Sequence, residues 1–202
     1  MKFNKNYWEN RYKEKKTGWD LGKISKPLKN YIDQLDNKNL HILIPGSGNG
    51  YEAEYLFKKN FKNIYYNDVS KLAIKNFKNR APSFPKTNIL DLNFFDINKK
   101  FDLIIEQTFF CALDPQVRQN YINKINDLIR NNGKLVGLFF DDIFKSQEPP
   151  FGSKKKNYTE LFNKFLNIKT FELCYNSELP REREMNFFVS PKKSNYFYIK
   201  LI

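Results

Sequence analysis

The sequence predicts a single α/β domain with a mostly parallel sheet and crossover helices. From Leu40 onward, short apolar runs alternate with longer amphipathic stretches, as they do in strand-helix-strand units. A glycine-rich segment follows the first apolar run, at the place where parallel sheets bind ligands. The chain has 202 residues, 41% of them hydrophobic, which is enough to fill one core. We expect one domain, with an N-terminal cap over residues 1–38 and a core over residues 39–202.

Two short helices are expected in the N-terminal cap. Residues 7–15 are polar with interspersed aromatic side chains and contain no Gly or Pro, and Thr17-Gly18 breaks this pattern. A second helix begins near Pro27, because proline is common in a first turn. Apolar residues follow it at helical spacing, namely Leu28, Tyr31, Ile32 and Leu35.

Strands and helices alternate through most of the core. The pattern predicts strands at 41–44, 63–67, 87–90 and 101–106, and helices at 51–59, 70–79 and 115–130. Ser70 is expected to cap the helix that it begins. A fifth strand is expected at 134–140, after a turn at Asn131-Asn132-Gly133.

The alternation stops after Asp141. A Pro-Pro loop and a short helix at 158–165 follow, and then two late strands at 168–175 and 196–201. We expect these two strands to add an antiparallel edge to the parallel sheet.

Composition excludes several classes of protein. No apolar run reaches the roughly 18 residues of a membrane span, and the polar start lacks a signal peptide's apolar segment, so we expect a cytoplasmic protein. Cys111 and Cys174 lie far apart without metal-ligand spacing, which predicts neither a disulfide nor a metal site. The single histidine, His41, opens an apolar strand and does not suit a Ser-His-Asp relay.

The net charge of +13 favours a nucleic-acid partner only weakly. Basic residues are scattered along the chain, and their densest run, 154–156, is three residues long. We interpret most of them as solvated surface.

The segment 44–52 and Asp68 together predict a nucleoside cofactor. Gly46, Gly48 and Gly50 let the backbone approach a ligand closely, and Asp68 ends the next strand 22 residues after Gly46. An acidic side chain there accepts hydrogen bonds from ribose hydroxyls. The alternative is that the glycines only form a tight turn and Asp68 only caps the following helix.

Glycine spacing separates two cofactors. The dinucleotide pattern G-x-G-x-x-G requires a third glycine at position 51, which is Tyr51 here. G-x-G-x-G is the commoner form where S-adenosylmethionine binds, since that cofactor has no pyrophosphate. The spacing therefore favours S-adenosylmethionine over NAD.

The chain resembles the thiopurine S-methyltransferase family, particularly its plant and bacterial thiol and halide methyltransferase branch. The resemblance runs from about residue 7 to residue 165, and its most specific piece is the Phe-Phe-Cys-Ala stretch at 109–112. The other matching pieces are Tyr7-Trp8, Arg11-Tyr12, Gly18-Trp19-Asp20, 44–52, Asn93-Phe94-Phe95, 101–108 and Pro149-Pro150-Phe151-Gly152.

This resemblance implies a Rossmann-like, seven-stranded class I methyltransferase sheet with helices on both faces and an N-terminal helical cap that closes over S-adenosylmethionine. It implies cofactor contacts by Trp8, Tyr12, Trp19, Gly46, Gly48, Asp68, Asn93, Phe94, Glu106 and Gln107. Asn93 and Phe94 would lie by the adenine, and Glu106 and Gln107 by the amino-acid portion or the methyl group. Two positions depart from the family: Tyr12 replaces a frequent Trp, and Asn93 replaces the usual Asp.

The chemistry implied is methyl transfer to a soft nucleophile by in-line displacement. Thiols, hydrosulfide and halides are partly or wholly anionic at neutral pH, so no histidine base is required. Gln107, Phe109, Phe110 and Tyr158 are the candidates for the acceptor pocket, with the loop at 149–152 as a lid. Phe139 and Phe140 are assigned to the core. Arg118 either orients an anion or ties a helix to a loop.

Two other functions are alternatives to methyl transfer to a soft nucleophile. Nucleic-acid methyltransferases that act on exocyclic amines carry an Asp/Asn-Pro-Pro-aromatic motif after the fourth strand, where this chain has 106–109, Glu-Gln-Thr-Phe. A non-catalytic S-adenosylmethionine-binding protein is the second alternative. The expected acceptors are thiol or hydrosulfide first, halide second and thiopurine-like thiols third, and the expected state is a monomer.

Overall fold

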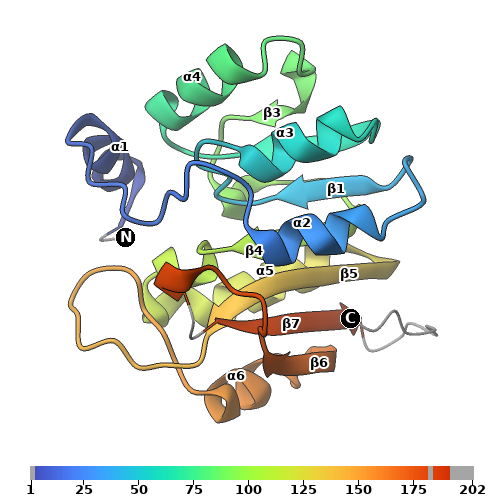
Figure 1. Cartoon of the computed structure of the whole chain (residues 1–202). Coiled ribbons are helices and arrows are strands. Elements are labelled where there is room, and N and C mark those ends of the chain that lie inside the picture. Colours follow the sequence, from blue (N-terminus) through green and yellow to red (C-terminus); the bar gives the residue numbers. More distant parts are fainter. Residues whose placement is uncertain (1–2, 182–183, 192–202) are drawn as a thin grey trace.

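A computed structural model describes residues 3–181 and 184–191 of the chain (Figure 1). Seven strands form one sheet in the order β3-β2-β1-β4-β5-β7-β6, in agreement with the predicted fold class. The strands are β1 (His41–Ile44), β2 (Asn63–Asn67), β3 (Ile89–Leu90), β4 (Phe101–Gln107), β5 (Ile129–Phe140), β6 (Leu166–Leu173) and β7 (Glu184–Pro191). β1 to β5 are parallel, and β7 pairs antiparallel with both β5 and β6.

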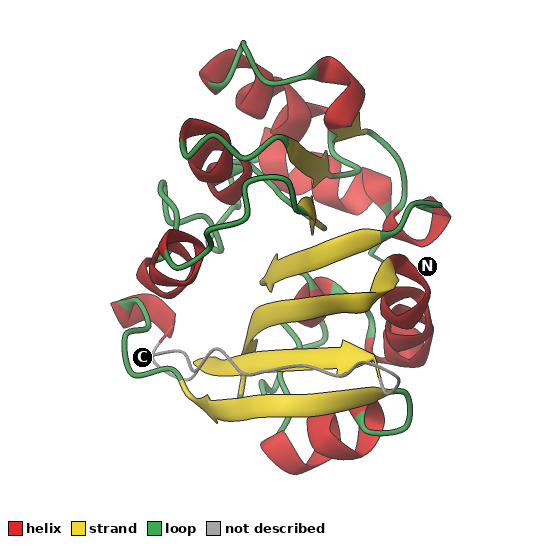
Figure 2. Ribbon diagram, turned by 90° about the vertical axis from the view of Figure 1, so that its right-hand side faces the viewer, coloured by secondary structure: helices red, strands yellow, loops and turns green. Residues whose placement is uncertain are grey.

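Helices cover both faces of the sheet (Figure 2). They are α1 (Lys5–Lys13), α2 (Lys26–Asp33), α3 (Tyr51–Lys58), α4 (Lys71–Arg80), α5 (Arg118–Leu128) and α6 (Lys155–Phe162). One buried cluster joins α2, α3 and α4 to the sheet, and a second cluster, rich in Phe and Tyr, joins α5 and α6 to the opposite face. Two layers of helices thus enclose the sheet, as an α/β sequence pattern requires.

The first helix, α1, belongs to neither core. It contains no buried residue and packs beside α4, over the carboxyl ends of the central strands (Figure 1). The Glu9 carboxylate accepts hydrogen bonds from Ser70 Oγ at 2.8 Å and from the Leu72 amide at 3.3 Å. Because a helix N-terminus favours an anion, this contact fixes α1 to the start of α4. Ser70 also caps α4 as predicted, accepting from the Ala73 amide.

The prediction of a turn at Asn131-Asn132-Gly133 was wrong. These residues lie inside β5, where the pairing with β4 shifts between Phe101 and Leu103. β5 therefore carries extra residues relative to β4, which is a bulge rather than a turn. Residues that favour turns also occur in bulges, so only the pairing of the two strands distinguishes a bulge from a turn.

The antiparallel edge was expected, but one of its strands was not. β6 lies close to the predicted range 168–175, whereas β7 falls at 184–191, where no strand was predicted. The predicted strand at 196–201 lies outside the described residues. No helix among residues 3–181 and 184–191 is both long enough and apolar enough to cross a membrane.

Candidate active site

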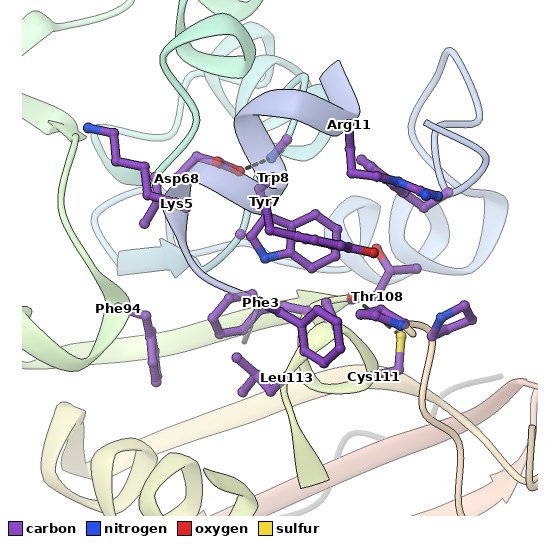
Figure 3. A pocket seen from close by; sticks show the side chains of 18 of the residues that line it. Phe3, Lys5, Tyr7, Trp8, Arg11, Asp68, Phe94, Thr108, Cys111 and Leu113 are labelled. Carbon is purple, nitrogen blue, oxygen red and sulfur yellow. Dashed lines mark hydrogen bonds between the residues drawn. The ribbon is translucent and has the colours of Figure 1, made fainter. Parts of the chain in front are cut away.

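A cavity of about 840 Å³ lies at the carboxyl ends of the central strands, beneath α1 (Figure 3). Loops after β1, β2, β3, β4 and β5 contribute to its wall. Eight of the residues that the resemblance assigns to the cofactor line it: Trp8, Tyr12, Trp19, Gly46, Gly48, Asp68, Asn93 and Phe94. The fold thus brings together side chains from the cap and from three separate loops.

The loop after β1 carries two glycines at which a side chain would collide with neighbouring residues. Gly46 and Gly48 both have φ near 55°, a left-handed conformation that favours glycine. A β-carbon at position 46 would overlap the ring of Phe109, and one at position 48 would lie 2.8 Å from the Tyr12 hydroxyl. Glycine at both positions therefore lets Phe109 and Tyr12 lie directly against this loop, and Gly46 and Gly48 line the cavity without side chains of their own; we call this segment the glycine cradle.

Asp68 supports the start of α4, as one of the two readings of the sequence expected, and it also lines the cavity. Its carboxylate accepts from the Ser70 amide at 2.8 Å, which supports the start of α4, and from the Gly48 amide at 2.8 Å, which holds the glycine loop. The same side chain lines the cavity. A carboxylate has about four acceptor positions, and the backbone amides of Ser70, Gly48 and Val69 do not use all of them, so acceptor capacity remains for a ligand hydroxyl. Burial raises the pKa of Asp68, and the backbone hydrogen bonds oppose that shift.

Aromatic side chains from the N-terminal segment form the roof. The Trp8 and Trp19 rings meet edge to face with centroids 5.4 Å apart, and Tyr12 meets Trp19 at 5.7 Å. Burial holds the pKa of Tyr12 well above its usual range, so its hydroxyl stays protonated. The departure from Trp at position 12 therefore preserves an aromatic wall.

Asn93 and Phe94 lie on the side of the cavity that follows β3. The Asn93 side chain accepts from the Phe95 amide at 3.1 Å and begins a short 3-10 helix at Phe94–Asp96. Phe94 is buried, with its ring centroid 5.1 Å from that of Phe109. Asn93 thus lines the cavity while its side-chain oxygen caps this short helix.

The placement of Glu106 by a cofactor is corrected by the structure. Glu106 is only 1% exposed and does not line the cavity. Its carboxylate accepts from the amides of Phe109 and Phe110, both at 2.8 Å. Burial raises the pKa of Glu106 to about 8. Through these two hydrogen bonds, Glu106 holds the loop after β4 against the end of the strand.

Gln107 lies beside the glycine loop but not in the large cavity. Its amide donates to the Glu184 carboxylate at 3.0 and 3.2 Å, and it lines a smaller chamber of about 60 Å³. Thr108, the next residue, lines both spaces and has a φ of 63°, which is unusual for a β-branched residue. The backbone therefore turns sharply here.

Of the four acceptor-pocket candidates, one lines the large cavity, one lines only the smaller chamber and two lie in the core. Phe109 lines the cavity, but Phe110 and Tyr158 are 1% and 2% exposed and belong to the aromatic core. The Tyr158 hydroxyl donates to the Phe140 carbonyl at 3.0 Å. Phe139 is in the core as predicted, whereas Phe140 lines the cavity. Adjacent aromatic residues point to opposite sides of a strand end, and the sequence does not distinguish the two sides.

The remaining wall was mostly missed by sequence reasoning. Leu113 and Cys111 lie across the cavity from Asp68 (Figure 3). Phe144, Pro149 and Pro150 also line the cavity. Only the proline pair had been predicted, as a lid. Arg118 does not line the cavity and donates to the Phe151 carbonyl at 2.6 Å, so it ties α5 to the lid loop.

The lid loop and α1 meet over the cavity. The Tyr7 hydroxyl lies 3.3 Å from the Glu148 carboxylate, and Arg11 lies 3.8 Å from the same group. Lys5, Arg11 and Arg181 are the basic residues among those that line the cavity in the described part of the chain. Cationic walls raise the local concentration of anions.

Comparison with known proteins agrees with this geometry. A family model described as thiopurine S-methyltransferase matches residues 3–194. The probable thiol methyltransferase 2 of Arabidopsis thaliana is 28% identical over 159 residues, which cover 76% of this chain and 70% of that protein. Thiocyanate methyltransferase 1 of the same plant is 23% identical, with the same coverage.

A solved structure shares the fold. The 1,6-didemethyltoxoflavin-N1-methyltransferase of Burkholderia thailandensis, solved with S-adenosylhomocysteine, has a TM-score of 0.73 and 10% identity. The likeness covers 93% of this chain and 86% of that chain.

Proposed function

This chain belongs to the thiopurine S-methyltransferase family and is an S-adenosylmethionine-dependent methyltransferase, and on that premise we propose that its acceptor is a small soft nucleophile. The nucleophile is a thiol, hydrosulfide or a halide. Thiols stand first, and the names of the plant relatives, thiol and thiocyanate methyltransferases, support that order.

The residues of the large cavity suit the cofactor. When bound, S-adenosylmethionine supplies an electrophilic methyl group on a sulfonium. At Gly46 and Gly48 the cofactor can lie close to the protein backbone. The Asp68 carboxylate can accept hydrogen bonds from its ribose hydroxyls. Asn93 and Phe94 bind the adenine, while Trp8 and Trp19 exclude water from above.

We infer the class of acceptor from the described residues of the cavity, because none of them is positioned to act as a general base. His41 begins β1, at the opposite end of the strand. Asp68 is engaged by two backbone amides, and Asp91 pairs with Lys71. Burial raises the pKa of Cys111, so this side chain stays a thiol. An acceptor that arrives as an anion requires none of these groups to remove a proton.

The cavity walls favour such anions. Phe109, Phe140, Phe144 and Leu113 are apolar and limit the water around a bound nucleophile. Arg11 and Lys5 provide a positive potential on the α1 side. The protein then contributes orientation, because holding the nucleophile in line at roughly 3 to 3.5 Å from its target carbon supplies much of the rate.

Headspace analysis tests this proposal. The protein is incubated with S-adenosylmethionine and, separately, hydrosulfide, iodide or a small alkyl thiol, and the volatile methylated product is quantified. We expect methyl transfer to the thiol or hydrosulfide to exceed transfer to iodide. Cofactor binding without any methylated product would support the non-catalytic alternative instead.

The pH profile of the same reactions tests for the missing base. For a thiol acceptor with the pKa of a cysteine side chain, near 8.5, kcat/KM should rise about tenfold per pH unit up to that value and then level off. With iodide, which does not titrate, kcat/KM should stay nearly flat. An equal rise with both acceptors would indicate a titrating protein group and contradict the proposal.

A further inference from the structure

We propose that Arg181 binds the carboxylate of the cofactor's amino-acid end, in the small chamber beside the glycine loop. This inference depends on the use of S-adenosylmethionine stated above and not on the identity of the methyl acceptor. It adds a residue that neither the sequence pattern nor the resemblance had assigned.

The chamber adjoins the large cavity. Its volume is about 60 Å³, and it shares Trp19, Gly46, Gly48, Thr108 and Arg181 with the wall of the larger space. A volume of this size holds about four water molecules, close to the five heavy atoms of an amino-acid head group. The chamber can therefore receive one end of a ligand whose remainder occupies the large cavity.

Strand order places the chamber at the correct end of the cofactor. β1 lies between β2 and β4 in the sheet. Asp68 and Asn93, the ribose and adenine candidates, follow β2 and β3, whereas Gln107 of the chamber ends β4. A ligand lying across the glycine loop with its nucleoside toward β3 has its other end at Gln107 and Arg181.

The chamber carries charges of both signs, as a zwitterion requires. Asp20 and Glu52 line it together with Arg181. Lys23 also lines it, but its side chain is 66% exposed and lies 3.5 Å from the Glu178 carboxylate. Arg181 is thus the buried cation of the chamber among the described residues, and the two carboxylates suit the ligand's ammonium group.

Among the described residues, Arg181 makes no ion pair shorter than 3.9 Å, although it also interacts electrostatically with the Glu52 carboxylate. The residue is 7% exposed, and its guanidinium donates to the Trp19 carbonyl, a neutral acceptor. The described ion pair of Arg181 is with Glu184, at 3.9 Å. That carboxylate already accepts from Gln107 and from Ser177 Oγ at 2.9 Å, and burial raises its pKa. A buried guanidinium is costly without a closely paired anion, so an arriving carboxylate gains a charge-assisted, two-pronged contact.

Binding calorimetry with three ligands tests this role. S-adenosylhomocysteine has the whole amino-acid end, decarboxylated S-adenosylhomocysteine keeps only its ammonium, and 5′-methylthioadenosine has neither. We expect Arg181→Met to weaken S-adenosylhomocysteine roughly 10- to 100-fold and to leave 5′-methylthioadenosine within about twofold. The variant should also remove the wild-type preference for S-adenosylhomocysteine over the decarboxylated ligand.

Two further variants sharpen the experiment. Arg181→Lys keeps the positive charge but loses the planar guanidinium that can bind a carboxylate through two hydrogen bonds. Its affinity for S-adenosylhomocysteine should therefore lie between those of the wild type and Arg181→Met. Arg130→Met is the matched control, because Arg130 pairs with Asp102 at the amino end of β4, far from the chamber. Its affinities for all three ligands should equal those of the wild type.

Three outcomes would overturn the proposal. An equal loss for all three ligands would show that Arg181 only supports the fold through Trp19. An unchanged S-adenosylhomocysteine affinity with a raised KM for the acceptor would assign Arg181 to the acceptor. Failure of the wild type to bind any of the three ligands would remove the cofactor site itself. Absence of a methylated product, in contrast, would refute the acceptor proposal while these binding constants still test Arg181.

Discussion

The ring of Phe109 packs directly against the α-carbon of Gly46, at a place where any β-carbon would overlap it. Phe109 is in turn held by Glu106, whose carboxylate accepts from the Phe109 amide at 2.8 Å. The loops after β1 and β4 are thus fitted to each other at the floor of the cavity, and a buried acid maintains the fit.

Substituting Gly46 should disturb this contact and the cofactor site together. We expect Gly46→Ala to lower the free energy of unfolding by about 1 to 3 kcal/mol, because φ is near 55° and the ring must move. Affinity for S-adenosylhomocysteine, measured by calorimetry, should fall at least about tenfold. Gly18→Ala is the control for stability, since no atom lies within 4 Å of its added β-carbon. Unchanged binding by Gly46→Ala would contradict the cradle.

Asp68 should be required for the ribose contact. Asp68→Asn keeps one oxygen for the backbone amides but loses the charge and part of the acceptor capacity. We expect affinity for S-adenosylhomocysteine to fall roughly 10- to 100-fold. Asp91→Asn is matched, because Asp91 also lines the cavity but pairs with Lys71 at the surface. Similar losses in both variants would indicate a general effect of charge and argue against a specific ribose contact.

Glu106 should make the protein less stable as the pH rises. Burial raises its pKa to about 8 from an ordinary value of 4.5, so between these values the folded protein binds more protons than the unfolded chain. The free energy of unfolding therefore falls through this window and levels off above it. Across this whole window the loss of stability from Glu106 is on the order of 5 kcal/mol.

Urea unfolding at pH 5 and pH 8 measures this effect. Glu106→Gln keeps an oxygen for the amides of Phe109 and Phe110, and its stability should decline less between the two pH values. Glu160→Gln changes an exposed side chain 3.9 Å from Lys156, and its decline should match that of the wild type. An identical decline in Glu106→Gln and the wild type would refute the assignment.

The correction of Tyr158 gives a further prediction. Tyr158→Phe removes the hydrogen bond to the Phe140 carbonyl and should destabilise the protein by about 1 kcal/mol. The KM for the methyl acceptor should not change, because Tyr158 is buried in the core. Phe144→Ala should raise that KM several-fold with little effect on stability, since Phe144 lies on the connection between β5 and α6 and lines the cavity. Steady-state kinetics and thermal unfolding separate the two cases.

Local patterns in the sequence were sufficient for much of the fold. The strands at 41–44 and 63–67 and the cap at Ser70 lie where they were predicted. The sequence also predicted that the glycine loop and Asp68 lie at one ligand-binding edge of the sheet, and both line the cavity. That prediction needs only residues adjacent in the chain and the rule that parallel strands present their carboxyl ends at one edge. Composition, spacing and family resemblance thereby determined the class of fold and of cofactor.

Contacts between distant segments were decided only by tertiary structure. The sequence treats Phe109 and Phe110 alike, yet one lines the cavity and the other lies in the core, because packing against Gly46 and Tyr121 selects their sides. Glu106 turned inward because the loop after β4 offers it two amides. Arg181 reached the glycine loop only because β7 inserts between β5 and β6. The direction in which each of these side chains points depends on which neighbouring groups pack against it in the folded chain. The chemical type of the residue does not determine that direction.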